Sequence, residues 1–475
     1  MKKAVKIVKK VFVFLGYTIA VILIVLVCSV LFSKKDYDTP DSPLGEALKS
    51  IAIKNVNVIS MTKNEEEVQS NMTVLIDHGK ITKILPDSIP FHSKYQVKEG
   101  AGKFLMPGLI DMHAHIFDRS DLPMYLGYGV TTVRNMMGFP MHLRWKKQVK
   151  EGSYPGTNLI TASPTINGGN NTGPFHKNIE SSESAINAVN TYKEKGYDFI
   201  KVYDGLSTNQ FASIMKTAKQ NNMRVAGHPP KISLKELLQS SIVSIEHTEE
   251  LLQFLDEEKS EESMRNLARK FKAFNKAVTL NLIAFNRIYK TTQKGVNYYN
   301  TIQEVPLNPV IKFIGTKQLE VYTKAGPKYK AYAKTKYEAM KNLSRILVEE
   351  GVTVLFGTDS GPNFISAGLP ILEEMNLLKD AGVSKFEILK SATRNAGIVL
   401  NNQNLGTVTV NAIADLLLLN ENPLENLETL KNPEAIVSNN IWYSKKGIEE
   451  LRNLGKGKAS TFMTIGRFLD HLISK

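Results

Sequence analysis

Hydrophobic and polar residues follow two different rhythms along the 475-residue chain. Residues 51–105 alternate apolar and polar positions in short runs broken by Asp-His-Gly, which predicts strands joined by hairpins. The same alternation returns in residues 405–420 and 434–444. Because these segments flank a longer middle, we expect residues 50–106 and 401–450 to form one composite β-sandwich domain.

The middle of the chain, residues 107–400, instead carries short apolar runs separated by stretches of helical character. Strands that alternate with helices in this way over a segment of this length are typical of a (β/α)8 TIM barrel, so the predicted fold class is α/β. The eight candidate strands are 109–115, 130–136, 158–163, 198–204, 223–228, 242–247, 278–285 and 352–359.

The first 35 residues form a separate unit outside the globular fold. Five lysines precede residues 11–32, a run of 22 residues without a charge that is long enough to cross the roughly 30 Å hydrocarbon layer as a helix. A cleavable signal peptide has a shorter apolar core and a small-residue cleavage site, and neither is evident. We therefore predict an uncleaved transmembrane anchor over 1–35, an acidic linker over 36–49 and, at the other end, a helical tail over 451–475.

The lysines before the apolar run favour an N-terminus inside the cell. This makes the protein a single-pass membrane protein with an extracytoplasmic body, periplasmic or extracellular, although Lys34 and Lys35 on the far side weaken the bias. Cys28 is the single cysteine and lies within the apolar run, so no intrachain disulfide can form. Lipid modification of Cys28 is a minor alternative, because Val27 fits poorly before a modified cysteine.

The net charge of +14 suggests nucleic-acid binding until its distribution is considered. Residues 1–35 hold seven lysines and no acidic residue, so half of the charge belongs to the anchor. In the remainder, lysines are mixed with glutamates as on a solvated helix face, and no nucleic-acid motif accompanies them. We therefore expect no nucleic-acid partner, and the sequence leaves the oligomeric state open.

Residues with ligand chemistry stand at the C-terminal ends of five predicted strands, where barrel enzymes carry their reactive groups. They are His113, His115, Lys201, His228, His247 and Asp359. Residues two apart on a strand point to the same side, so His113 and His115 can both bind one metal ion. His228 and His247 lie one βα unit apart and can bind a second ion.

Each of these residues also has a plainer interpretation. An isolated His-x-His pair is more often two core histidines bonded to the backbone, and Asp359 suits a helix N-cap. Lys201 is costly at a buried strand end, and on its own it would be paired with Asp204 or with a substrate carboxylate. The company of several ligand-type residues at matching strand ends favours the metal interpretation for the histidines and Asp359.

Several motifs together resemble the metal-dependent amidohydrolase superfamily, in its imidazolonepropionase-like and Xaa-Pro dipeptidase-like branch, over residues 50–440. They are PGLIDMHAH, the lysine of the fourth strand, VAGH, SIEH, GTD and the closing run from EEMNLLKD to NENPLENL. The resemblance implies a hydrolase with two divalent metal ions, typically Zn²⁺. The ligands that it implies are His113, His115 and Asp359 for one ion and His228 and His247 for the other, with carboxylated Lys201 and a hydroxide bridging them.

The resemblance also implies catalytic roles. The metal ions would lower the pKa of the bridging water and polarise the scissile carbonyl, while Asp359 relays the proton to the leaving group. Tyr203 shares the face of Lys201, so it is a candidate to hydrogen-bond the carbonyl oxygen in the transition state. The alternative for Tyr203 is an aromatic ring that fills the top of the barrel.

Two departures from the family pattern concern the substrate pocket. The family often has Gly-Gly-His after the third strand, where this chain has Asn170, and His176 follows a few residues later. Related sequences often carry a histidine before the Glu-containing helix, and this chain has Pro370 nearby. These departures put the substrate in doubt rather than the hydrolysis.

Residues 285–326 form a long insertion with little periodicity, which we expect to be a lid or binding loop. Tyr298 and Tyr299 in this insertion are candidates to reach the substrate. Arg224 and Arg394 could bind a substrate carboxylate, although surface pairing is the simpler expectation.

The sequence thus predicts a membrane-anchored, metal-dependent amidohydrolase that hydrolyses the amide C–N bond of a small substrate such as a dipeptide or an N-acyl amino acid. A mononuclear cyclic amidohydrolase is the nearest alternative, and Lys201 argues against it. A non-catalytic surface binding protein with a vestigial site is the other alternative, and the intact ligand set argues against that one.

Overall fold

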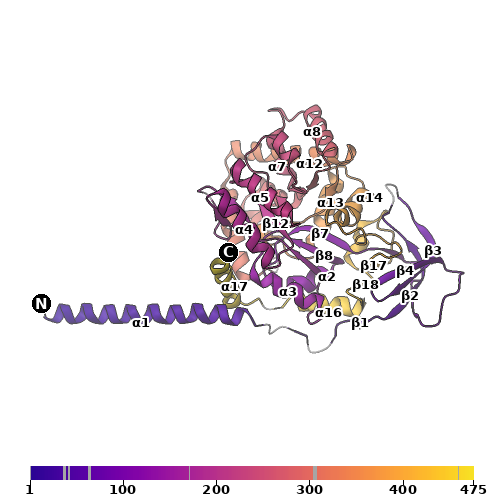
Figure 1. The fold of residues 1–475 in the computed structure, drawn as a ribbon, viewed down its shortest axis with the longest axis horizontal. Coiled ribbons are helices and arrows are strands. Elements are labelled where there is room, and N and C mark those ends of the chain that lie inside the picture. Colours follow the sequence, from indigo (N-terminus) through magenta and orange to yellow (C-terminus); the bar gives the residue numbers. More distant parts are fainter. Residues whose placement is uncertain are drawn as a thin grey trace.

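The computed structural model describes residues 2–475 apart from 36–38, 41–42, 63–65, 171, 303–306 and 458. Figure 1 shows a long helix, α1 (Lys2–Ser33), that projects from a body of strands and helices. The body has a β-rich part at one end and a helix-rich part with parallel strands at the other.

The β-rich part is a nine-stranded sheet drawn from both flanks of the chain. Its strands are β1 (Glu46–Ala47), β2 (Ser50–Val58), β3 (Gln69–Asp77), β4 (Lys80–Pro86), β5 (Gln96–Glu99), β6 (Phe104–Pro107), β17 (Leu416–Leu419), β18 (Ala435–Ser438) and β19 (Ile441–Ser444). The order is β1-β19-β18-β17-β6-β2-β3-β4, and β5 also pairs with β2, so hydrogen bonds make it one branched sheet. The predicted sandwich and the division into domains stay predictions.

The helix-rich part contains parallel strands in two groups. One group is β7 (Leu109–Ala114), β8 (Val130–Asn135) and β9 (Asn158–Thr161); the other, in spatial order, is β11 (Lys177–Ile179), β10 (Ile166–Gly168), β12 (Phe199–Val202), β13 (Arg224–Gly227), β14 (Ser244–Glu246), β15 (Ala277–Thr279) and β16 (Val354–Leu355). Single parallel bridges, Ala162 to Phe199 and Ala114 to Ser360, link the two groups. Most of these parallel strands lead into a helix, which agrees with the predicted TIM-barrel type of fold.

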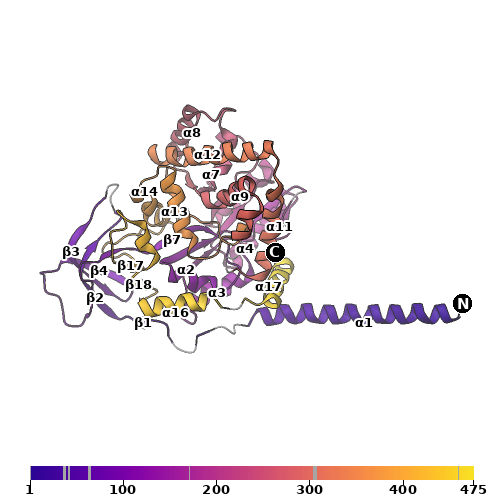
Figure 2. The same ribbon diagram turned by 180° about the vertical axis from the view of Figure 1, so that it is seen from behind.

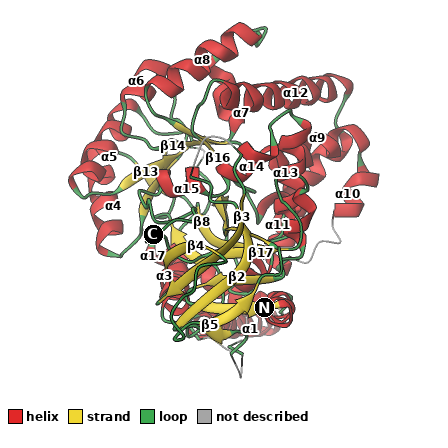
Figure 3. Ribbon diagram, turned by 90° about the vertical axis from the view of Figure 1, so that its right-hand side faces the viewer, coloured by secondary structure: helices red, strands yellow, loops and turns green. Residues whose placement is uncertain are grey.

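Helices surround these parallel strands, as Figure 3 shows from the side of the large sheet. They are α2 (Asp121–Gly127), α3 (Pro140–Lys150), α4 (Ser182–Glu194), α5 (Thr208–Gln220), α6 (Leu234–Gln239), α7 (Thr248–Leu251), α8 (Glu261–Ala273), α9 (Leu282–Lys294), α10 (Val296–Ile302), α11 (Pro309–Glu320), α12 (Pro327–Glu349), α13 (Pro370–Asp380), α14 (Lys385–Ser391) and α15 (Arg394–Val399). Short 3₁₀ turns are η1 (Leu252–Phe254), η2 (Val321–Lys324), η3 (Pro362–Phe364) and η4 (Leu427–Lys431).

Local sequence explains where several helices begin. The hydroxyls of Ser181, Ser207, Ser233 and Ser384 each accept a backbone N–H from the first turn of α4, α5, α6 and α14. Such N-caps satisfy donors that a helix leaves free at its start. The apolar faces of these helices then pack on the strands in one large core.

The predicted strand over 278–285 is wrong in its second half. Strand β15 ends at Thr279, Asn281 takes a left-handed backbone conformation, and α9 begins at Leu282. The buried carboxylate of Glu374 accepts the N–H groups of Leu282 and Ile283, so it caps the helix from another part of the chain. The apolar residues 282–285 are compatible with a strand or a helix, and the cap from Glu374 stabilises the helix.

The predicted loop over 285–326 is also wrong, because its described residues are mostly helical. They form the rest of α9 together with α10, α11 and η2. These helices bury apolar residues against η3, including Tyr299 and Leu319. Tertiary packing of this kind stabilises helices whose own sequence shows little periodicity.

The two ends of the chain meet at one place. The C-terminal part contains α16 (Lys445–Gly455) and α17 (Thr461–Ser474), and α17 packs beside the end of α1 (Figures 1 and 2). Among the described residues, α1 is the one helix that is long and apolar enough to cross a membrane.

Candidate metal centre

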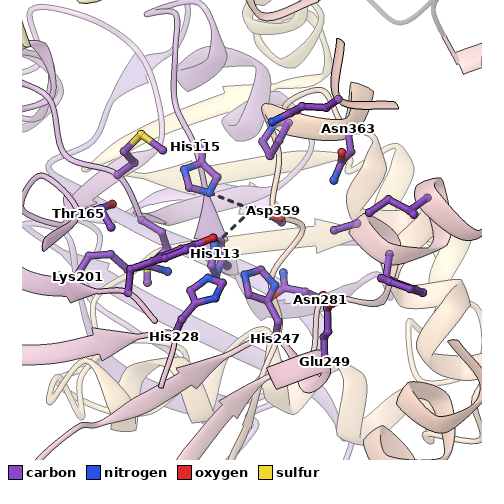
Figure 4. A pocket seen from close by; sticks show the side chains of 18 of the residues that line it. His113, His115, Thr165, Lys201, His228, His247, Glu249, Asn281, Asp359 and Asn363 are labelled. Atoms are coloured by element: carbon purple, nitrogen blue, oxygen red, sulfur yellow. Dashed lines mark ion pairs between the residues drawn. The ribbon is translucent and has the colours of Figure 1, made fainter. Parts of the chain in front are cut away.

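The six predicted ligands lie together at the C-terminal ends of the parallel strands. All of them line one cavity of about 360 Å³. Figure 4 shows their side chains converging from different strands: His113, His115, Lys201, His228, His247 and Asp359. The arrangement predicted from strand spacing is therefore present, while the role of each residue stays a prediction.

The tightest group in the cavity is His113, His115 and Asp359. One ligand atom from each lies within 4.8 Å of the others. Asp359 Oδ1 is 3.0 Å from His115 Nε2 and 3.4 Å from His113 Nε2. The backbone fixes this geometry, because the N–H of Asp359 donates to the carbonyl of His113 at 2.7 Å.

Two of the candidate ligands have an unusual backbone. The φ angles of His247 and Asp359 are 72° and 53°, a left-handed region that residues other than glycine rarely adopt. At these strand ends the conformation turns the side chains into the cavity, and the rings of His113 and His247 lie 4.4 Å apart between centroids. Strain of this kind gathers at functional sites.

Two acids, the buried Glu246 and the half-buried Glu250, hold two of the histidines, and the sequence reasoning did not find them. Glu246 lies 2.9 Å from His113 Nδ1 and also accepts from Arg134 at 2.7 Å, with all three residues buried. Glu250 lies 2.8 Å from His228 Nδ1. An acid on Nδ1 orients the ring and leaves Nε2 for a ligand.

Burial sets the protonation of these groups. Desolvation, together with the nearby His247 and Lys201, holds the pKa of His113 well below its usual value. Desolvation likewise lowers the pKa of His228. Burial alone would raise the pKa of Asp359, but the hydrogen bond to His115 and the neighbouring imidazoles lower it. Neutral imidazoles and an ionised carboxylate are the forms in which these residues bind metal.

Lys201 lies on β12, and Tyr203 directly follows that strand. Burial lowers the pKa of the Lys201 ammonium to about 8, against the opposing effect of Glu246 and Asp359. A lowered pKa increases the fraction of Lys201 that is a neutral amine, and the neutral amine is the form that reacts with CO₂. The centroid of the Tyr203 ring lies 4.1 Å from that of His228 and 4.9 Å from that of His176, with the rings tilted, and burial raises the pKa of Tyr203.

The remaining wall of the cavity is mixed in character. Its apolar part consists of Met136, Met137, Ala284, Phe285, Ile288, Met340 and Pro362. Asn281 also lines the cavity, and both polar atoms of its buried side-chain amide lack a hydrogen-bond partner in the described structure. A buried amide without partners is costly, so it marks a place where a substrate can bind.

Several residues that the sequence associated with substrate take other places. Asn170 is exposed, whereas His176 lines the cavity. Pro370 lines a separate cavity of about 430 Å³, so its departure from the family pattern does not touch the metal site. The lining residues of the site also include neither Arg224 nor Arg394.

The two tyrosines of the insertion do not reach the site. The hydroxyl of Tyr298 accepts from Arg287 at 2.9 Å, and Tyr299 packs edge-on against Phe364. The expectation that they contact substrate is wrong, because the insertion folds into helices that turn these rings toward their own core.

Comparison with known proteins places the chain in a family. The sequence model of the Amidohydrolase family matches residues 104–441, which is more than half of the chain. The chain belongs to the amidohydrolase family. The membership confirms the family predicted from the motifs, which is a family of hydrolases.

Individual members of the amidohydrolase family resemble this chain to different extents. A segment of 101 residues is 31% identical to the ochratoxinase of Aspergillus niger. This segment spans 21% of this chain and only 20% of the length of the ochratoxinase. Among solved structures, bottromycin amidohydrolase has a TM-score of 0.70 at 21% identity and covers 91% of this chain and 93% of its own. A Xaa-Pro dipeptidase with bound methionine in its active site has a TM-score of 0.67 at 17% identity and covers 83% of this chain and 100% of its own.

The amidohydrolase family generally binds divalent metal ions, and the residues of this member fit such ions. Neutral imidazole nitrogens and a carboxylate oxygen are the donors that Zn²⁺ prefers. Within the described part of the chain the buried Nδ1 of His115 has no partner, so the contact of its Nε2 with Asp359 sets the orientation of that ring. Glu246 and Arg134 were missed because their partners come from other strands; an arginine inside the apolar run of residues 130–136 was the one available signal.

Proposed function

We propose that the protein is a membrane-anchored, metal-dependent hydrolase of an amide bond in a small substrate, with a dipeptide or an N-acyl amino acid as the substrate class. The observation that carries the proposal is the largely buried group of His113, His115 and Asp359, with His228 and His247 beside it. The single bridges between the two groups of strands support a closed barrel around this site.

The proposed metal centre holds two divalent ions, Zn²⁺ by the chemistry of its donors. His113, His115 and Asp359 would bind one ion, and His228 and His247 would bind the other. Lys201, carboxylated to a carbamate, would be a ligand of both ions. Bound metal would supply an activated water near neutral pH and polarise the carbonyl.

The side chains of this protein would supply proton transfer and positioning. Asp359, ionised and next to two imidazoles, would take a proton and pass it to the leaving nitrogen. The phenol of Tyr203 stays protonated because burial raises its pKa, so it can donate to the carbonyl oxygen of the substrate. The side-chain NH2 and the side-chain oxygen of Asn281 both lack partners among the described residues, so they can donate to and accept from an amide group of the substrate.

The proposed location is a membrane, with α1 as a single span and the body periplasmic or extracellular. The apolar span Lys6–Ser33 supports the anchor, and the lysines before it support an inside N-terminus. The proposed partners are a small amide substrate and the lipid around α1.

A mononuclear enzyme that opens a cyclic amide is the second candidate. The observation that favours it is that the ligand atoms meeting within 4.8 Å belong to one group, which fits a single ion. Metal content separates the two candidates, because the mononuclear enzyme would hold one equivalent per chain and the proposed centre two.

The test is a mass-spectrometric hydrolysis screen of the full chain in detergent, supplied with zinc and bicarbonate. Xaa-Pro dipeptides, other dipeptides, N-acyl amino acids and cyclic amides are the substrates. We expect cleavage by the native protein and by a variant at an exposed acid, Asp380→Asn, and a loss of about a hundredfold or more in Asp359→Asn. A protein that binds no metal and cleaves nothing in the panel would refute the proposal.

A further inference from the structure

Helix α17 has an apolar surface that the described part of the chain leaves exposed. Its buried side carries Thr464, Phe468 and His471 among others. The opposite side is exposed and apolar: Phe462 (39% exposed), Ile465 (39%), Leu472 (42%) and Ile473 (79%). Helical spacing places these residues on one face, so α17 is apolar on both sides. An exposed apolar face of this kind marks a contact with a protein or a membrane.

The buried side of α17 rests on the catalytic end of the parallel strands. The ring of Phe468 contacts Phe117, Phe139 and Phe175 at centroid distances of 5.9, 5.7 and 4.7 Å. These three rings lie in the segments that follow β7, β8 and β10. His471 stacks on Phe139 at 3.8 Å. Helix α17 therefore covers part of the face on which the candidate metal centre opens.

Polar contacts fix α17 at this position. Arg467 pairs with Asp118 at 3.2 Å, just beyond His115 on the same segment. Asn308 donates both to Asp118 at 3.0 Å and to the hydroxyl of Thr464 at 2.7 Å. The exposed face of α17 is thus held in one orientation relative to the site.

The same helix meets the end of α1. An added Cβ at Gly466 would come within 2.0 Å of the carbonyl oxygen of Ser29, so the two backbones touch. Lys34 pairs with Asp470 at 3.1 Å, and the rings of Phe32 and Phe462 lie 6.2 Å apart. Helix α1 then leaves the body on this side (Figures 1 and 2).

The uncharged part of α1 has the length of a bilayer core. It begins at residue 11, after the last of the five N-terminal lysines, and 20 helical residues from there rise about 30 Å, which is the thickness of the hydrocarbon layer. Residues 11–25 are exposed on every side, whereas Ser29 and Ser33 are buried against the body. If α1 spans a membrane, the lipid surface lies near residue 30, next to α17.

We propose that the exposed face of α17 lies in the lipid interface of the bilayer that α1 spans, so that the catalytic end of the strands faces the membrane. The inference rests on the proposed anchoring by α1. Amphipathic helices bind in the lipid interface by inserting their apolar residues, and basic residues add an attraction to anionic headgroups. Lys177, Lys195 and Lys475 gather at the end of α17, where Lys195 donates to the carbonyl of Ser474 at 2.6 Å.

The test measures how deep single residues of the full chain lie in vesicles of phosphatidylcholine and phosphatidylglycerol. In a Cys28→Ser background, cysteine replaces Ile473 or Leu472 on α17, Leu23 on α1, or Val410, which is 52% exposed beside the large sheet. Each cysteine carries an environment-sensitive fluorophore, and nitroxide-labelled lipids act as quenchers. These positions are exposed, so the label does not disturb packing.

We expect lipids labelled near the headgroup to quench the probes at Ile473 and Leu472, and deeply labelled lipids to quench the probe at Leu23. The probe at Val410 should keep its fluorescence with both. Quenching at Leu23 with none at Ile473 and Leu472 beyond that at Val410 would overturn this inference and leave the anchor intact. Loss of quenching at Leu23 as well would overturn both the anchor and this inference.

Discussion

At the scale of single residues, the site depends on groups that hold the ligands in place. Glu246 is fully buried between His113, Arg134, Ser244 and Thr279. Burial would raise its pKa, but Arg134 and His113 hold it well below the usual value. The carboxylate therefore fixes which nitrogen of His113 faces the metal site.

Replacing Glu246 with glutamine should weaken both metal binding and stability. The variant leaves Arg134 buried without a charged partner, at a cost of about 3 kcal/mol in the free energy of unfolding. Loss of the acid on Nδ1 should lower zinc affinity by about tenfold to a hundredfold. Zinc titration and thermal unfolding check both, with the exposed Glu257→Gln as the control. Unchanged zinc affinity would contradict the positioning role.

Asn281 offers a second residue-scale prediction, because its side-chain amide has no hydrogen-bond partner among the residues that the structure describes. Asn281→Gly suits the left-handed backbone, where φ is 47°, so the fold should lose little stability. Loss of hydrogen bonds worth about 1.4 kcal/mol should raise KM about tenfold. The matched control is Asn401→Gly, an exposed residue with φ of 58°. A normal KM together with lower stability would make Asn281 structural.

Residue-scale prediction from sequence succeeded where a strand alone fixes direction. His113 lies on β7 and His115 directly follows the strand, two residues on, so their common face follows from period two. Asn281 was assigned to a strand interior and its role was missed, because the turn at this residue depends on Glu374, far along the chain.

At the scale of elements, the cap on α9 links helix stability to pH. Burial raises the pKa of Glu374 from its usual 4.5 to about 8, although two backbone N–H groups oppose this. A carboxyl group whose pKa is raised in the folded state holds its proton more tightly there. Its contribution to stability is therefore full below about pH 4.5 and is lost as the pH rises through about 8.

Glu374→Gln should remove this dependence, because glutamine is neutral at every pH and its carbonyl still accepts an N–H. Between pH 5 and pH 8, roughly the window over which Glu374 loses its proton, the native protein should lose a few kcal/mol more than the variant. Thermal unfolding at both pH values measures the difference, with the exposed Glu425→Gln as the control. Parallel curves for native protein and variant would show that Glu374 stays ionised.

At the scale of the whole molecule, the order of strands and helices was predictable, whereas the packing of the two chain ends was not. Repetition of strand and helix over residues 107–400 is a local signal, and a TIM-barrel type follows from it. Contact between α1 and α17 joins residues more than 400 positions apart, for which no pattern in either segment is informative. The contact with α1 places the exposed apolar residues of α17 beside the proposed membrane span, which their sequence alone does not indicate.

This placement leads to a prediction about substrate supply. If the catalytic end faces the bilayer, an N-lauroyl amino acid held in vesicles should reach the apolar wall of the cavity more readily than it would in a protein turned away from lipid. We expect Ile473→Asp to slow hydrolysis of the N-lauroyl substrate in vesicles and to leave hydrolysis of the water-soluble N-acetyl amino acid unchanged, because the change weakens contact with lipid without touching the site. Val410→Asp, exposed beside the large sheet, should alter neither rate. Equal slowing of both substrates by Ile473→Asp would mean that α17 acts by supporting the site, and not by presenting it to the membrane.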